Sequence, residues 1–172
     1  MGVVLLRIDD RLVHGQVVEG WLKAIRATRI VVASDSVASD EMQKALYLLA
    51  VPQGVPLSCL SLDEAAEAWA SAPWKNERVL VLVSSPQDVV TLLQKGVRIE
   101  SVNVGGLHFR EGRVQILKAV SVDEHDVEAL KTLMQRGVLL EARPLPLDEP
   151  VDLKSYLDRW QQEREALRDQ PR

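Results

Sequence analysis

Short apolar runs alternate with amphipathic stretches along the 172-residue chain, and this alternation constrains the fold more than any other feature. The runs are rich in β-branched residues with few polar interruptions, which is typical of strands covered on both faces. The stretches between them place apolar residues three and four positions apart, which indicates helices. Predicted strands cover residues 3–8, 29–34, 55–60, 78–84, 101–104 and 138–143, with a weaker one at 114–119.

We therefore expect an α/β fold: an open, mostly parallel β-sheet with helices on both faces. Strands joined through helices run parallel, with right-handed crossovers. The length suits a single domain. We expect this domain to cover residues 1–168, its last helix to lie at 151–168, and residues 169–172 to form a frayed tail.

Composition excludes several classes of function. The net charge is −4 and the basic residues are scattered, so no nucleic-acid partner is expected. No apolar run approaches the ~20 residues of a transmembrane helix, and the amino terminus does not resemble a signal peptide. We therefore expect a cytoplasmic protein that reaches a membrane only through partners. Nucleotide-binding glycine motifs are missing, and the single cysteine and three dispersed histidines predict no metal site, so no cofactor is expected.

His14 stands where the first predicted strand gives way to a helix, and Asp9, Asp10 and Arg11 flank it. In open α/β sheets, ligands bind at the carboxyl ends of strands. A carboxylate that accepts from one imidazole nitrogen leaves the other free as a nucleophile, and a guanidinium clamps phosphate oxygens. The pattern predicts that His14 carries or meets a phosphoryl group, assisted by Asp9 and Arg11. A lone loop histidine is more often a surface or capping residue, so both interpretations stand at this point.

The start of the following helix supplies backbone donors. The amides of Gly15, Gln16 and Val17 are expected to bind an anion, because a helix amino terminus presents unpaired N–H groups. Loops after other strands end at the same sheet edge and predict a phosphate or sugar-phosphate pocket. Ser and Asp at these positions suit helix N-caps equally well. The candidate pocket residues are Ser34, Asp35, Ser84, Gly105 and Gly106.

Two further residues attract attention but favour other roles. His108 lies between Leu107 and Phe109, which predicts a packed segment and a structural histidine. Trp74 follows Pro73 in a loop and is expected to be exposed, where it is available to a partner.

Three segments of the chain resemble one known family. They are RIDDRLVHGQV at residues 7–17, VNVGGLHFREG at 102–112 with AVSVDE at 119–124, and the segment 137–153. Together they resemble the IIB component of the mannose/fructose/sorbose family of the bacterial sugar phosphotransferase system. The resemblance extends over roughly residues 4–156 and implies the same mostly parallel α/β sheet.

The resemblance implies that His14 is the phosphorylated residue, on Nδ1, with Asp9 and Arg11 as assisting neighbours. It also implies a protein-N(pi)-phosphohistidine–sugar phosphotransferase without a cofactor. The phosphoryl group would come from a histidine of the IIA component and pass to a sugar held by the membrane components IIC and IID. The chain would then associate peripherally with the inner membrane through these partners.

Two other functions stay open on the residues alone. The same chemistry serves a regulatory phosphoacceptor that is not coupled to sugar uptake. A binding module or hydrolase with His14 as general base would need a nucleophile or metal cluster, and the sequence offers none that is well placed.

Overall fold

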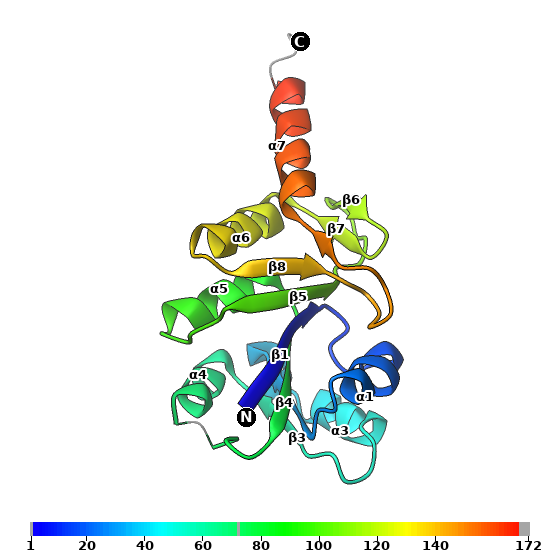
Figure 1. The fold of residues 1–172 in the computed structure, drawn as a ribbon, viewed down its shortest axis with the longest axis vertical. Helices are drawn as coiled ribbons and strands as arrows, with labels where there is room; N and C mark the ends of the chain where they lie inside the picture. Colours follow the sequence, from blue (N-terminus) through cyan, green and yellow to red (C-terminus); the bar gives the residue numbers. More distant parts are fainter. Residues whose placement is uncertain (1, 72, 169–172) are drawn as a thin grey trace.

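The computed structural model describes residues 2–71 and 73–168 and shows an open sheet in the strand order β3-β2-β4-β1-β5-β8-β9 (Figure 1). The strands are β1 (Gly2–Asp9), β2 (Arg29–Ala33), β3 (Leu57–Leu60), β4 (Arg78–Val83), β5 (Ser101–Gly106), β8 (Leu139–Ala142) and β9 (Val151–Asp152). Within the described residues, β8 and β9 pair antiparallel and all the other neighbours pair parallel. The predicted fold class is confirmed.

Helices cover both faces of the sheet (Figure 1). One face carries the π-helix η1 (Gln16–Trp21), α1 (Leu22–Ala24), α2 (Asp35–Ala38) and α3 (Glu41–Ala50), and the other carries α4 (Leu62–Ser71), α5 (Pro86–Gln94) and α6 (Glu124–Gln135). Alternate residues of β2 belong to different apolar clusters. Val31 and Ala33 pack in one, and Ile30 and Val32 in the other. Because strand side chains alternate between faces, each face has its own core.

Two predicted elements are present but shorter than expected, and one local prediction was wrong. The segment 114–119 is a shorter strand, β6 (Val114–Leu117), which pairs antiparallel with β7 (Val120–Val122) in a separate two-stranded sheet. The predicted helix at 151–168 begins later, as α7 (Lys154–Arg168), because residues 151–152 form β9 and the Asp152 carboxylate accepts from the Lys154 amide at 3.0 Å. Trp74 is only 8% exposed and packs in the larger core. The predicted tail, 169–172, lies outside the described residues.

The connections around β1 create a crevice. The chain leaves β1 towards η1 and α1 on one face, whereas the connections from β4 and β5 run through α5 and α6 on the other. β1 and β5 are neighbours in the sheet. Ligands of open α/β sheets bind where adjacent strands send their connections to opposite faces. The carboxyl ends of β1 and β5 are therefore the place to look for a site.

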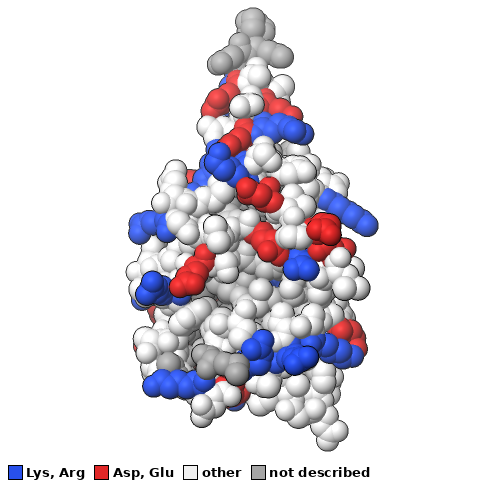
Figure 2. Space-filling model, in the orientation of Figure 1, with Lys and Arg blue, Asp and Glu red and all other residues white. Residues whose placement is uncertain are grey.

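The surface and the helices add two observations. Acidic and basic side chains are interspersed over the face drawn in Figure 2. In the described part of the chain, no helix combines the length and the apolar character needed to cross a membrane.

Candidate functional site

Two charged side chains are buried at the carboxyl end of β1. Arg7 and Asp9 have side chains that are 0% exposed, and they share a face because they are two positions apart in a strand. Arg7 Nη2 donates to Asp9 Oδ2 at 2.8 Å, and Nη1 donates to Asn103 Oδ1 at 2.6 Å. No role was predicted for Arg7. The signal that could have found it is a charged residue inside an apolar strand.

Arg7 also joins β1 to two other segments. Nη1 and Nη2 donate to the backbone carbonyls of Arg143 and Pro144, which follow β8, at 3.1 and 3.2 Å. The guanidinium carbon lies 5.2 Å from the ring centroid of Trp21 in η1, a cation–π distance. The Trp21 indole donates to the same Pro144 carbonyl at 2.8 Å. This one arginine therefore ties together the strand, the helix and the loop around the site.

His14 is held by Asp9. His14 Nε2 lies 2.9 Å from Asp9 Oδ2. An ionised carboxylate only accepts hydrogen bonds, so in the neutral imidazole Nε2 carries the proton and Nδ1 keeps its lone pair. In the described residues, Nδ1 has no hydrogen-bond partner, and the side chain is 15% exposed. The imidazole is therefore fixed in the orientation and tautomer of a nucleophile.

Asp9 is ionised at neutral pH. Its burial raises the pKa, but the hydrogen bond from His14 and the positive charge of Arg7 lower it by more, so the pKa lies below its ordinary value. The same carboxylate oxygen, Oδ2, accepts from both the Arg7 guanidinium and the His14 imidazole.

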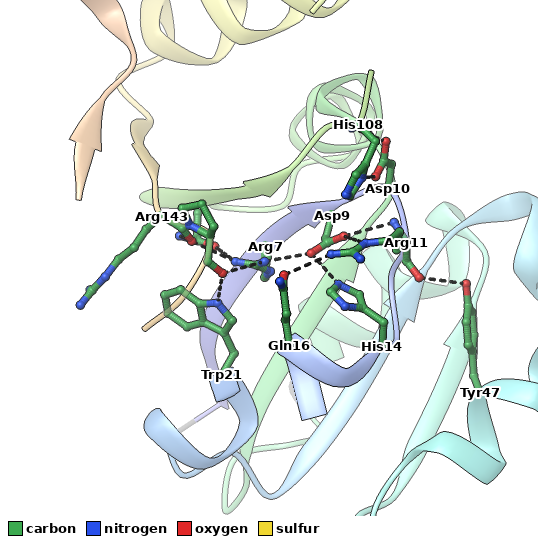
Figure 3. A network of polar contacts seen from close by, with 12 residues as sticks. Arg7, Asp9, Asp10, Arg11, His14, Gln16, Trp21, Tyr47, His108 and Arg143 are labelled. Carbon is green, nitrogen blue, oxygen red and sulfur yellow. Dashed lines mark hydrogen bonds and ion pairs between the residues drawn. The ribbon is translucent and has the colours of Figure 1, made fainter. Parts of the chain in front are cut away.

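A tight turn places Arg11 over the other oxygen of this carboxylate. The Arg11 amide donates to Asp9 Oδ1 at 3.2 Å, and Arg11 Nε lies 4.0 Å from the same atom. Leu12 follows with a φ of +55°, an unfavourable conformation for leucine, while its side chain is buried in the core beneath. Packing of Leu12 thus fixes the turn. The Arg11 side chain stays 46% exposed, and Nη2 donates to Gln16 Oε1 at 3.1 Å (Figure 3).

The helix start contributes fewer free donors than the sequence suggested. Gly15 has helical backbone angles and precedes η1 without a side-chain cap. The Val17 amide donates to the His14 carbonyl at 3.0 Å. Of the three amides expected to meet an anion, those of Gly15 and Gln16 remain for that role.

The hydroxyl-bearing loops serve helix starts. Ser34 caps α2, and the Asp35 carboxylate accepts from the Leu62 amide at 2.8 Å. The Ser84 hydroxyl donates to the Asp88 carboxylate at 2.8 Å. These side chains follow the N-cap interpretation, and the geometry does not bring them to His14.

The two glycines after β5 do lie at the site. A Cβ on Gly105 would stand 1.8 Å from the guanidinium carbon of Arg7, so only glycine leaves room for that side chain. A Cβ on Gly106 would stand 3.3 Å from Asp9 Oδ1. Both positions therefore bring β5 backbone close to the buried ion pair.

Asp10, which also flanks His14 in the sequence, has other partners. Its carboxylate accepts from the amide and the Nδ1 of His108, and from Arg113 Nη1 at 3.4 Å. Figure 3 shows Asp10 pointing to His108. Asp10 is the first residue after β1 and lies in the turn, where its side chain contacts His108 and Arg113, so Asp9 and Asp10 serve different partners. His108 is therefore not packed between apolar neighbours: its side chain is 47% exposed, and that of Phe109 is exposed as well.

Comparison with known proteins identifies the family. Residues 3–168 match the family described as PTS system sorbose subfamily IIB component, and the chain belongs to this family of phosphotransferase-system IIB components. It is 44% identical over 157 residues to the fructose-specific EIIB component of Bacillus subtilis (strain 168), covering 91% of this chain and 96% of that one. The resemblance expected from the sequence is confirmed.

Two other relatives extend the comparison. The mannose-specific EIIAB component of Escherichia coli (strain K12) is 43% identical over 162 residues, which are 92% of this chain but 50% of that protein. The IIB domain of the sorbose permease from Klebsiella pneumoniae has a similar structure, with a TM-score of 0.86 at 36% identity, covering 92% of this chain and 98% of that one.

Gly105→Ala tests the packing around Arg7. We expect it to lower the free energy of unfolding by about 3 kcal/mol, because the new methyl group overlaps a side chain fixed by its hydrogen bonds. Gly15→Ala is the matched control. It has no atom within 4 Å of the new Cβ and should change stability by less than about 1 kcal/mol. Urea unfolding measures both, and equal stability of Gly105→Ala and wild type would contradict the proposed packing.

Acid unfolding tests the ionisation of Asp9. Its pKa is lowered in the folded state, so the stability that it contributes is present above the ordinary carboxyl value of about 3.9 and is lost as the pH falls through the folded value. We expect Asp9→Asn to flatten the dependence of unfolding free energy on pH in that acid range. The more exposed Asp158→Asn should keep the wild-type dependence. Identical pH profiles for wild type and Asp9→Asn would refute the shift.

Proposed function

We propose that this chain is a phosphoryl carrier that acts as a protein-N(pi)-phosphohistidine–sugar phosphotransferase. His14 accepts a phosphoryl group from a phosphohistidine of the IIA component and passes it to a sugar bound by the membrane components IIC and IID. The observation that carries the proposal is the hydrogen bond from His14 Nε2 to the buried Asp9, which leaves Nδ1 as the nucleophile. One relative is named an EIIAB component, which supports a IIA partner. The chain would work in the cytoplasm and meet the membrane through IIC and IID.

Neither transfer needs a cofactor, because each bond that forms is matched by one that breaks. In the first, the Nδ1 lone pair of His14 attacks phosphorus, the donor's N–P bond breaks, and its electron pair returns to the donor ring. The Nε2 proton stays on the hydrogen bond to Asp9, whose negative charge compensates the phosphorylated ring. In the second, a sugar hydroxyl oxygen attacks phosphorus, the electron pair of the P–N bond returns to Nδ1, and the hydroxyl proton is released to water. Catalysis then consists of positioning and charge stabilisation.

Arg11 is the group placed to stabilise the transferring phosphoryl oxygens. It is anchored through its amide to Asp9 and through Nη2 to Gln16, yet its guanidinium is partly exposed on the side of His14. A planar guanidinium donates two parallel hydrogen bonds to phosphate. The amides of Gly15 and Gln16 would add contacts at the start of η1.

The donor would dock over α3, beside this site. No residue of α3 is buried, and four of its large apolar side chains are exposed: Met42 (76%), Leu46 (54%), Leu48 (63%) and Leu49 (84%). The Tyr47 hydroxyl of the same helix donates to the Arg11 carbonyl at 3.5 Å. A protein interface covers roughly 800 Å² on each partner. A IIA surface centred on His14 would therefore extend over α3 and remove these apolar groups from water.

His14→Ala tests the assignment of the acceptor. We expect it to abolish acid-labile phosphorylation by a phosphorylated IIA partner while the protein stays folded, because no other side chain replaces the nucleophile. His125→Ala, at an exposed position in the first turn of α6, is the control and should be labelled like wild type. Mass mapping locates the phosphate, and NMR of the ring distinguishes Nδ1 from Nε2. Equal labelling of His14→Ala would exclude the proposal.

Arg11→Lys tests the clamp. Lysine keeps the charge but loses the planar pair of donors, so we expect phosphoryl transfer to slow by about tenfold or more. The free energy of unfolding should change by less than about 0.5 kcal/mol, because the side chain is partly exposed. Arg159→Lys, on an exposed position of α7, controls for the substitution itself. A wild-type transfer rate in Arg11→Lys would exclude the bidentate contact and leave Arg11 only a role in packing or in attracting the ligand.

A further inference from the structure

A pocket of about 540 Å³ opens beside the phosphoryl site. Arg11 and Gln16 form its wall on the side of His14, and Gly105, His108 and Phe109 from the end of β5 form another. It thus lies in the crevice between the carboxyl ends of β1 and β5, where the connections of the sheet diverge. Its volume is within the range of small-molecule sites, about 300–1,000 Å³.

We propose that this pocket binds the ring of the monosaccharide during the second transfer, an inference that rests on the proposed function. The reacting hydroxyl must approach the phosphorus on His14 to roughly 3–3.5 Å. The ring that carries this hydroxyl must then lie next to Arg11 and Gln16, the residues that the phosphoryl site and the pocket share. The acceptor would be recognised by this chain as well as by the membrane components.

Phe109 supplies an apolar platform. Its ring is 73% exposed, although the sequence pattern predicted a packed side chain. An exposed aromatic ring at the edge of a pocket that also contains polar groups offers a flat face to the C–H side of a sugar, which has apolar faces and polar edges. Leu145, which is 39% exposed, adds a second apolar group to the same lining.

The polar groups of the lining match sugar hydroxyls. His108 uses Nδ1 for Asp10, which leaves Nε2 available to a hydroxyl. Asp148 and Glu149, in the loop after β8, bring carboxylates that accept hydrogen bonds from hydroxyls. These carboxylates repel anions, whereas Arg11 beside the phosphoryl site and Lys118 in the turn after β6 attract them. The lining therefore suits a ligand with a phosphoryl group at the Arg11 end and neutral hydroxyls elsewhere.

The experiment compares ligands that differ only in the sugar. Backbone amide NMR of the full chain is followed during titration with fructose 6-phosphate, mannose 6-phosphate and inorganic phosphate. We expect at least one sugar phosphate to shift the amides of Phe109 and Glu149 as well as those of Gly15 and Gln16, whereas inorganic phosphate shifts only the latter pair. Phe109→Ala should weaken binding of that sugar phosphate by about fivefold relative to inorganic phosphate, since an apolar contact is lost.

Leu167→Ala is the matched control, because it removes an exposed apolar side chain (65%) from α7, away from the pocket. It should bind like wild type. The inference is overturned if sugar phosphates and inorganic phosphate shift the same amides, or if Phe109→Ala leaves the ratio of affinities unchanged. Phosphorylation of wild-type His14 by a IIA donor is measured separately. Its absence would refute the carrier function, whereas normal phosphorylation without sugar-dependent shifts would refute only the sugar pocket.

Discussion

The buried pair of Arg7 and Asp9 is the interaction on which the rest of the site depends. Burying two charges is costly, and the cost is offset only where each charge has good hydrogen-bond partners. Arg7 finds them in Asp9, Asn103 and two backbone carbonyls. Asp9 finds them in Arg7, the Arg11 amide and His14. Removing either charge would leave the other buried without its partner. Because the same groups also bind the backbone of neighbouring loops, the network fixes these loops as well as the imidazole.

Two adjacent carboxylates at the end of β1 have different partners. Asp9, the last residue of the strand, contacts Arg7 and His14 and sets the tautomer of the imidazole. Asp10 points to His108 and Arg113, and Arg113 Nε in turn lies 3.0 Å from Asp126 Oδ2 in the first turn of α6. The end of β1 therefore positions residues on both sides of the crevice. Asp9 holds His14 at the proposed phosphoryl site, and Asp10 holds His108 in the wall of the neighbouring pocket.

Under the proposed function, this arrangement would give the two transfers different surroundings. The exposed apolar face of α3 adjoins Arg11 through Tyr47 and suits a protein donor. The pocket adjoins Arg11 through Gln16 and has the mixed lining that suits a small polar acceptor. Arg11 is the residue common to both. Its backbone amide binds Asp9 and its Nη2 binds Gln16, while the side chain stays partly exposed.

Periodicity and local spacing were enough to predict the α/β class, the position of His14 after a buried strand and the nearness of Asp9 and Arg11, because these features depend on residues close together in the sequence. They did not reveal Arg7 as an anchor, the division between Asp9 and Asp10, the buried Trp74 or the exposed Phe109. These depend on contacts across long separations, such as Arg7 with Asn103 and Pro144. Such contacts become visible only in the folded protein, because a local sequence pattern does not indicate which distant backbone groups will bind a buried charge.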